Sequence, residues 1–198
     1  MDQKVFKQQL LKQIYSPYIN CNGCPLGCLG RNHVIFGEGN PDAKLMFIGE
    51  APGRDEDIQG RPFVGRSGKL LDRSLEAVGI KRTDVYITNI VKCRPPNNRT
   101  PTEIESSICK KLLLSKQIKI IRPHVICTLG AASLKGLLEK ENIKITQMRG
   151  TTIDLDGYLV VPTYHPAYIL RNPKELKTLI ADLELARRLS FSTDKGGG

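Results

Sequence analysis

The stretch KLMFIGEAPG, residues 44–53, joins a short apolar run to a turn that contains glycine and proline. Residues 85–91 (VYITNIV), 125–129 and 158–163 (YLVVPT) have the same character, since apolar or β-branched residues continue until a loop begins. Continuous apolar runs of this length are typical of strands buried on both faces of a parallel sheet. The sequence therefore predicts four such strands.

Segments with helical periodicity separate the predicted strands. They cover residues 2–16, 67–78, 100–119, 130–140 and 174–189. The third begins with Thr-Pro-Thr-Glu at 100–103, which has the form of a capping box with proline at the first helical position. Strands that alternate with helices predict an α/β fold, a three-layer α/β/α sandwich around a central, mostly parallel four-stranded sheet. We expect a single domain over residues 1–190 and a disordered tail over 191–198.

The chain is strongly basic. Its 198 residues include 30 Lys and Arg against 20 Asp and Glu, a net charge of +10. This excess favours a polyanionic partner, nucleic acid first and a membrane surface second, although a basic balance can also serve solubility. No run of 18 or more apolar residues predicts a membrane-spanning helix. The charged, helix-patterned N-terminus is unlike a secretory signal, so we expect a cytoplasmic protein without membrane contact.

Polar side chains stand at the ends of three predicted strands. Glu50 follows the first strand, Asn89 lies in the second, and His165 follows the fourth. Ligands bind beyond the carboxyl ends of strands in parallel sheets, so we expect these three groups to meet at one edge. Each also has a structural interpretation: a solvated acid or helix cap, an amide bonded to backbone, and a histidine that satisfies a turn. Asn89 needs a partner either way, because an unpaired buried amide costs about 1–3 kcal/mol.

Six cysteines occur at positions 21, 24, 28, 93, 109 and 127. A disulfide scaffold is disfavoured, because the chain is apolar enough to fold without one and carries no export signal. Cys21 and Cys24 supply two thiolates from one loop, and cysteines of other elements can complete a Zn²⁺ site or an iron–sulfur cluster. The spacing does not choose between these sites, and it leaves open a rival set that includes Cys28.

Three long segments carry a resemblance to a known family. GEAPGRDEDIQGRPFVGRSGKLLD (49–72), TNIVKCRPPNNRTP (88–101) and HPAYILRN (165–172) resemble the motifs of the family-four uracil-DNA glycosylases, which contain iron–sulfur clusters and come largely from thermophiles. The likeness covers about residues 15–188. A related variant that traps uracil-DNA covalently has an added loop after the second motif, and this chain lacks that loop. The resemblance implies hydrolysis of the N-glycosidic bond of uracil in DNA, which leaves an abasic site during base excision repair.

The resemblance also assigns roles in uracil binding. Phe63 would stack on the flipped base, although a core phenylalanine is the alternative. Asn89 would donate to uracil O4 and accept from N3–H, a pattern that cytosine reverses. His165 would donate toward O2, where negative charge builds as the bond breaks.

Further roles fall on the segment after the first strand. Glu50, with the backbone of Ala51 and Pro52, would place the water or stabilise the oxocarbenium-like sugar; the sequence does not decide between general base and electrostatic partner. Glu56 would pack against C5 of uracil and exclude the thymine methyl group, or it is one more acid of the run RDED.

The resemblance chooses among the cysteines as well. Cys21, Cys24, Cys93 and Cys109 match the ligands of the family's [4Fe-4S] cluster, which leaves Cys28 outside. The cluster's expected role is structural, since glycosidic bond cleavage requires no electron transfer. Cys127, in an apolar strand, is expected to be a core residue.

DNA contact is expected to be mostly electrostatic. The turn at 65–68 opens a helix whose free N–H groups, at Arg66 and Ser67, could take a phosphate. The other basic candidates are Lys92, Arg94, Arg99 and Arg171. Ile169 or Leu170 would be the apolar wedge that fills the vacated stack.

Two alternatives remain open at this stage. One is a superfamily member that acts on other deaminated bases, such as hypoxanthine or xanthine. The other is a non-catalytic nucleic-acid-binding protein with the same fold. We expect a monomer that binds uracil-containing DNA, single- or double-stranded. A sliding-clamp contact is conceivable for a repair enzyme, but the tail shows no convincing clamp-binding peptide.

Overall fold

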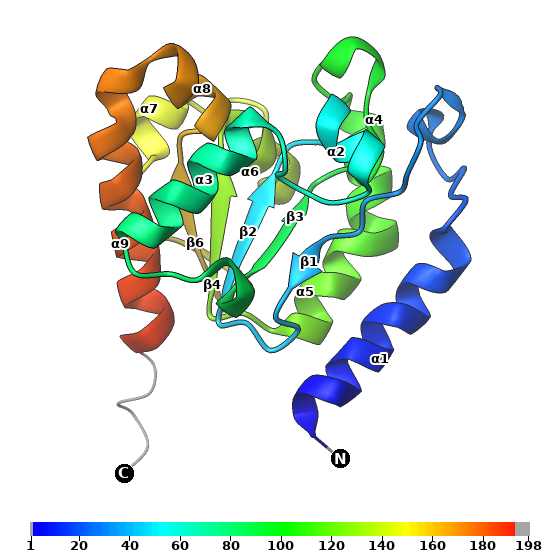
Figure 1. Ribbon diagram of the computed structural model, residues 1–198, viewed down its shortest axis with the longest axis horizontal. Helices are drawn as coiled ribbons and strands as arrows, with labels where there is room; N and C mark the ends of the chain where they lie inside the picture. Colours follow the sequence, from blue (N-terminus) through cyan, green and yellow to red (C-terminus); the bar gives the residue numbers. More distant parts are fainter. Residues whose placement is uncertain (1, 193–198) are drawn as a thin grey trace.

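The computed structural model describes residues 2–192 and is built around one six-stranded sheet (Figure 1). Its strand order is β1-β3-β2-β4-β6-β5. The strands are β1 (Glu38–Gly39), β2 (Leu45–Gly49), β3 (Tyr86–Asn89), β4 (Val125–Leu129), β5 (Ile153–Leu155) and β6 (Tyr158–Thr163). The four predicted strands are β2, β3, β4 and β6, and they pair in parallel.

The predicted total of four strands is wrong, because an antiparallel strand is added at each edge. β1 pairs with β3, and β5 pairs with β6. β1 has two residues and β5 has three, which is too short to produce a readable apolar period.

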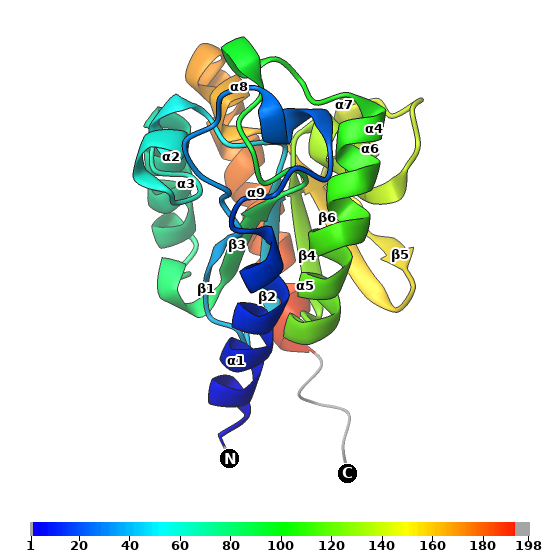
Figure 2. The same cartoon turned by 90° about the vertical axis from the view of Figure 1, so that its right-hand side faces the viewer.

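Helices cover both faces of the sheet, as the sequence predicts (Figure 2). They are α1 (Gln3–Tyr15), α2 (Arg54–Gln59), α3 (Arg66–Ala77), α4 (Glu103–Cys109), α5 (Ser115–Ile121), α6 (Ala131–Leu138), α7 (Ile145–Met148), α8 (Pro166–Arg171) and α9 (Leu176–Phe191). The short helices α2, α7 and α8 were not predicted, since one or two turns carry too little periodicity.

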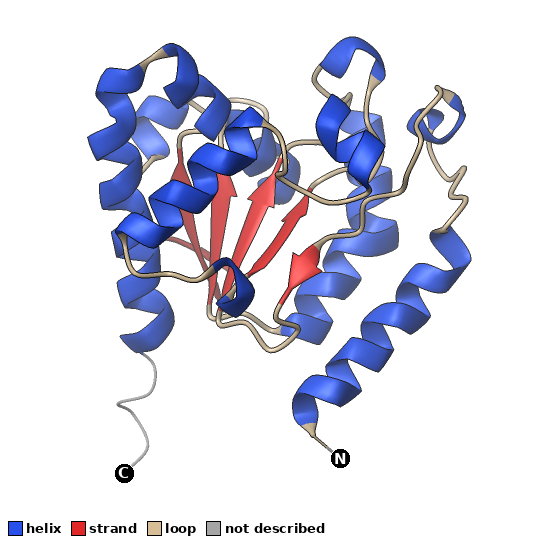
Figure 3. Ribbon diagram, viewed as in Figure 1, coloured by secondary structure: helices blue, strands red, loops and turns tan. Residues whose placement is uncertain are grey.

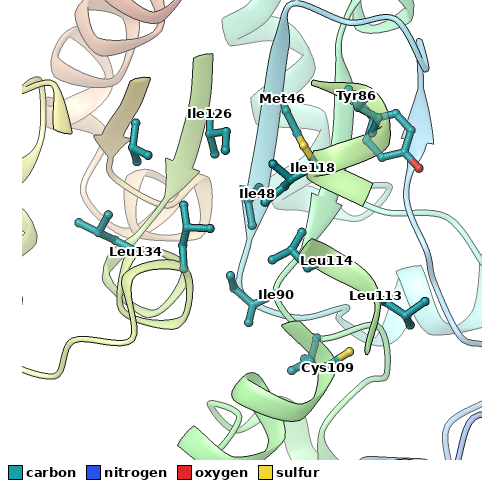
Figure 4. Packing of buried hydrophobic residues seen from close by; sticks show 14 of the residues in the cluster. Met46, Ile48, Tyr86, Ile90, Cys109, Leu113, Leu114, Ile118, Ile126 and Leu134 are labelled. Carbon is teal, nitrogen blue, oxygen red and sulfur yellow. The ribbon is translucent and has the colours of Figure 1, made fainter. Parts of the chain in front are cut away.

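Alternate residues of the strands enter two separate cores. In β2, Met46 and Ile48 pack with α1, α5 and α6, and this core includes Leu114 and Leu134 (Figure 4). Leu45 and Phe47 face the opposite way and pack with α3, α8 and α9. Cys127 of β4 is fully buried in this second core, which confirms its expected packing role.

The helix predicted over 100–119 begins later than expected. Thr102 is its N-cap, and the capping box joins Thr102 to Glu105 instead of Thr100 to Glu103. A π-helical turn, Lys110–Leu114, connects α4 to α5. The wide turn follows Cys109 directly, and π-turns of this kind are frequent at functional sites.

The carboxyl ends of the four parallel strands lie at the same edge of the sheet (Figure 3). The segments that follow them include α2 and α8. At the other end of the chain, α9 runs to Phe191, so the predicted tail begins too early; residues 193–198 lie outside the described part. Within residues 2–192, no helix is long and apolar enough to cross a membrane.

Candidate active site

A cavity of about 500 Å³ lies at the carboxyl ends of β2, β3 and β6. Its walls come from five segments of the chain that are distant in sequence. The lining residues are Glu50, Ala51, Pro52, Gly53, Glu56, Phe63, Ser67, Asn89, Pro95, Asn98, Arg99, Thr100, His165, Ala167, Tyr168 and Arg171. All seven residues predicted to bind uracil therefore line one cavity.

Asn89 closes the inner end of the cavity. It is the last residue of β3 and only 1% exposed. Its Oδ1 atom has no hydrogen-bond partner among the residues that the structure describes. A buried, unpaired amide oxygen costs about 1–3 kcal/mol, so this atom is suited to a ligand that brings a donor.

His165 is the N-cap of α8, and its ring is held in one tautomer. Its Nδ1 accepts a hydrogen bond from the backbone N–H of Ala167 at 3.0 Å, so the neutral ring carries its proton on Nε2. Burial lowers the pKa of His165 to about 4, and the nearby Arg171 charge acts in the same direction. At neutral pH His165 is therefore an uncharged hydrogen-bond donor.

Glu50 follows β2 directly and is half-buried. Burial raises the pKa of its carboxyl group, and a hydrogen bond from Thr100 partly opposes this shift. Glu50 and Thr100 also line a second cavity of about 360 Å³ on the side of Ser106 and Lys135. The Glu50 carboxylate thus stands in the wall between two solvent-accessible spaces, where it can contact a water molecule.

The loop that carries Phe63 has a strained conformation. Phe63 has a left-handed φ of 51°, and its ring centroid lies 5.9 Å from that of His165. Glu56 holds the loop: its Oε1 accepts from the N–H groups of Val64 and Gly65, both at 2.9 Å. Its Oε2 accepts from Gly53 N–H at 3.1 Å, which ties the turn after β2 to the Phe63 loop.

The comparisons with known proteins agree with this geometry. The family model of the uracil DNA glycosylase superfamily matches residues 36–184, about three quarters of the chain. The chain belongs to the uracil-DNA glycosylase superfamily. The resemblance found in the three sequence motifs is thereby confirmed.

Curated relatives of this superfamily align over most of the chain. A Type-4 uracil-DNA glycosylase of Thermotoga maritima is 48% identical and covers 96% of this chain and 98% of its own. One of Saccharolobus solfataricus is 52% identical and covers 82% of this chain and 78% of its own. A third, of Sulfurisphaera tokodaii, is 45% identical over 92% of this chain and 86% of its own.

Three of the residues predicted to contact DNA lie at the cavity. Ser67, Arg99 and Arg171 line it. Arg66 is exposed on the first turn of α3, and Arg94 donates to Asn98 Oδ1 at 2.8 Å; neither lines the cavity.

Burial removes two of the candidates for DNA contact, Ile169 and Lys92. Ile169 is 2% exposed and packs in the second core, so of the two wedge candidates only the half-buried Leu170 retains surface. Lys92 is completely buried, with its ammonium on Thr88 Oγ1 and on the Asn89 carbonyl. Burial lowers the pKa of Lys92 to about 7.

Four cysteines of the superfamily member gather beside the first core. The charges of Cys21, Cys24 and Cys109 all act on Cys93, which means that the four sulfurs lie near one another. Figures 1 and 2 show the segment after α1 beside α4, and a β-carbon on Gly23 would meet Leu112 at 2.7 Å. All six cysteines of the chain are free thiols, and Cys28 is exposed.

The spacing of the four sulfurs bears on what they can hold. No group of three His, Cys, Asp or Glu within residues 2–192 is close enough to hold one metal ion. Tetrahedral Zn²⁺ would need sulfurs at about 2.3 Å from one centre. Burial raises the pKa of Cys93 to about 12 and that of Cys109 to about 11, so their thiolates need a positive partner. Four cysteine thiolates are a ligand set that fits the cationic core of an iron–sulfur cluster.

Sequence reasoning missed six residues of the cavity wall: Gly53, Pro95, Asn98, Thr100, Ala167 and Tyr168. Three of them lie in the loop after β3, where sequence alone does not show which side chains turn inward. Tyr168 stands three residues after His165, one helical turn along α8, so the proximity of its side chain to His165 was readable. Its ring also packs on Tyr164, with centroids 4.9 Å apart.

Proposed function

We propose that the protein is a uracil-DNA glycosylase, a hydrolase that cleaves the N-glycosidic bond of uracil in DNA and leaves an abasic site. The observation that carries this proposal is the buried, unpaired Oδ1 of Asn89 at the inner end of a 500 Å³ cavity. Uracil presents N3–H to such an acceptor. The relatives from three organisms, all named Type-4 uracil-DNA glycosylases, support the same activity.

Uracil recognition is assigned to Asn89 and Phe63. The Asn89 amide accepts from N3–H and donates to O4, and cytosine fails because its N3 is an acceptor and its exocyclic amine a donor. Phe63 provides the face on which the flipped base stacks. The base reaches the cavity only after leaving the helix stack, which costs a few kcal/mol.

Bond cleavage leaves negative charge on the departing uracil. His165, neutral and with its proton on Nε2, donates a hydrogen bond toward O2 as this charge develops. Removing one donor of this kind from an enzyme typically costs about 10²–10³ in rate. A neutral donor is favoured here because burial opposes a charged imidazolium.

Glu50 is assigned to the sugar side of the reaction, together with the backbone of Ala51 and Pro52. Its carboxylate holds the attacking water or stabilises the oxocarbenium-like sugar. The raised pKa of Glu50 suits a group that takes up a proton from water. Glu56 hydrogen-bonds both the turn after β2 and the Phe63 loop. We propose that the position of Glu56 in the cavity wall excludes the C5 methyl group of thymine.

We propose that Cys21, Cys24, Cys93 and Cys109 hold a [4Fe-4S] cluster. Their charges act on one another, as expected for sulfurs that lie close together, and four thiolates are the ligand set of such a cluster. Backbone N–H groups of Leu26 and Gly27 face the Cys24 sulfur, and one from Gly23 approaches Cys21 Sγ at 3.5 Å. The cluster would join the N-terminal segment to α4 as a structural link.

DNA binding is assigned to the basic rim of the cavity, with the protein acting as a monomer. Arg99 and Arg171 stand at the cavity, and the N-terminal turn of α3 presents Arg66 and Ser67 to a phosphate. Arg94 lies nearby in the loop after β3. Leu170 is the remaining apolar candidate for filling the vacated stack.

A panel of labelled oligonucleotides tests the activity. Each carries one uracil, thymine, hypoxanthine or xanthine, and alkali cleaves the strand wherever a base has been removed. We expect cleavage at uracil in single- and double-stranded DNA and none at thymine. Cleavage only at hypoxanthine or xanthine would assign a different base, and no cleavage by the iron-loaded protein would contradict the proposal.

A further inference from the structure

Lys92 is a fully buried lysine between the cysteines and the candidate active site. Its Nζ atom donates to Thr88 Oγ1 at 2.6 Å and to the Asn89 carbonyl at 2.7 Å. Burying an ammonium group is costly unless it is paired and hydrogen-bonded. A lysine in this position therefore calls for an explanation in terms of its neighbours.

The main chain of Lys92 belongs to the cysteine site. Its N–H group hydrogen-bonds the Cys109 sulfur, and its carbonyl accepts from Ile35 N–H at 2.7 Å. The next residue is Cys93. Burial lowers the pKa of Lys92, and the charges of Cys109 and Cys93 oppose this shift.

The side chain of Lys92 reaches the residue that reads the base. Asn89 ends β3, and its carbonyl is held by the Lys92 ammonium while its Oδ1 stays free at the cavity. Thr88, the second acceptor, donates in turn to the Phe36 carbonyl at 2.8 Å. The ammonium thus fixes two successive residues at the end of β3.

We propose that Lys92 is a positioning residue that couples the cysteine site to uracil recognition. Its main chain contacts Cys109 and leads into Cys93, and its Nζ–H groups hold the Asn89 backbone so that the amide faces the cavity. This inference rests on the proposed function and on the proposed cluster. It gives the proposed cluster a part in the geometry of the active site.

The test compares substitutions at two buried lysines. Lys92→Met keeps the length of the side chain but removes the charge and the donors, and Lys92→Gln keeps a donor without the charge. Lys7→Met is the matched control, since Lys7 is also buried but its ammonium contacts Asp42 and the Ile121 carbonyl. The iron-loaded proteins are compared for iron release to a chelator, without DNA, and for kcat and KM on a uracil oligonucleotide.

We expect Lys92→Met to release iron at least tenfold faster than the wild type and to lower kcat at least tenfold, with KM within threefold. Lys92→Gln, which keeps a donor, should release iron more slowly than Lys92→Met and keep a higher kcat. Lys7→Met should stay within twofold of the wild type in iron release and kcat. Wild-type iron retention in both Lys92 variants, or losses no greater than in Lys7→Met, would overturn the proposal.

The two readouts separate this inference from the activity on which it rests. Iron release requires no substrate, so it tests the link between Lys92 and the cysteine site even if uracil proves not to be the base removed. If Lys92→Met does not fold, Lys92→Gln carries the test through iron release alone. A wild-type protein without uracil excision would overturn the proposed function and leave the iron result to decide whether Lys92 supports the cysteine site.

Discussion

Gly49 and Asn89 are register partners at the carboxyl ends of β2 and β3, and the absence of a side chain on Gly49 makes room for the Asn89 amide. A β-carbon on Gly49 would lie 2.4 Å from Asn89 Oδ1 and 2.5 Å from the Phe63 ring. The same glycine thus adjoins both groups assigned to the base. Gly49 therefore lies directly beside the Asn89 amide and the Phe63 ring.

Substituting Gly49 with alanine should damage recognition more than folding. The added methyl group would displace the Asn89 amide and the Phe63 ring, so we expect uracil excision to fall by about 100-fold, the scale of losing one oriented polar contact. Stability should fall by about 1–3 kcal/mol through overpacking. Excision rates and thermal melting measure the two effects.

The control for this change is Gly79→Ala. Gly79 has a left-handed φ of 72°, and a β-carbon there would meet nothing within 4 Å. The substitution should cost stability through backbone strain while leaving the excision rate intact. Equal losses of rate in the two variants would mean that Gly49 acts only through stability.

His165 should act as a neutral donor at all pH values near 7. His165→Ala should lower kcat by about 10²–10³ because the developing charge on uracil loses its donor. Since burial lowers the pKa of His165 to about 4, the wild-type pH–rate profile should show no step from this residue between pH 5.5 and 8. A step near pH 6.5 that vanishes in the variant would show that His165 titrates normally.

Stability should depend on pH through the same residue. The pKa of His165 is 6.5 in the unfolded chain and about 4 in the folded protein, so between these values the unfolded state binds more protons. Stability contributed by keeping the ring neutral is present above pH 6.5 and is lost as the pH falls toward 4.

The loss should amount to about 3 kcal/mol, from roughly 1.4 kcal/mol per pKa unit. Chemical unfolding at pH 7 and pH 4 measures it, and His165→Gln provides a side chain that does not titrate. The wild type should lose about 3 kcal/mol more than the variant between the two pH values. Parallel losses would contradict the lowered pKa.

Two cysteine substitutions should separate the cluster ligands from the exposed thiol. Cys109→Ser should lose iron and lower the melting temperature, because Cys109 is buried at the end of α4 beside Cys93. Cys28→Ser should keep both iron and stability, since Cys28 is exposed. Iron content and melting temperature measure both, and equal iron loss in the two variants would add Cys28 to the ligands.

The sequence was most informative where strands end. The apolar runs located β2, β3, β4 and β6, and the topology of a parallel sheet predicted that Glu50, Asn89 and His165 would meet, as they do at one cavity. The end of a parallel strand strongly constrains the position of the next residue, because the residues that follow all parallel strands lie at the same edge of the sheet.

Features set by tertiary packing could not be predicted in the same way. Lys92 looks like a surface charge in the sequence, and only the fold places it between Cys109 and Asn89. Ile169 faces the core because of the direction in which α8 leaves His165. The left-handed φ of Phe63 depends on Glu56, eight residues from Val64 in the chain, accepting from the loop backbone.

The central claim is that the free amide of Asn89 selects uracil for excision, and single-turnover kinetics test it most directly. The wild type and Asn89→Ala, both loaded with iron and both checked by thermal melting, are mixed in excess with an oligonucleotide that carries one uracil. We predict rapid removal of uracil by the wild type and a rate at least 100-fold lower for the variant, while the melting temperatures stay similar. Equal excision rates in the two proteins would contradict the account.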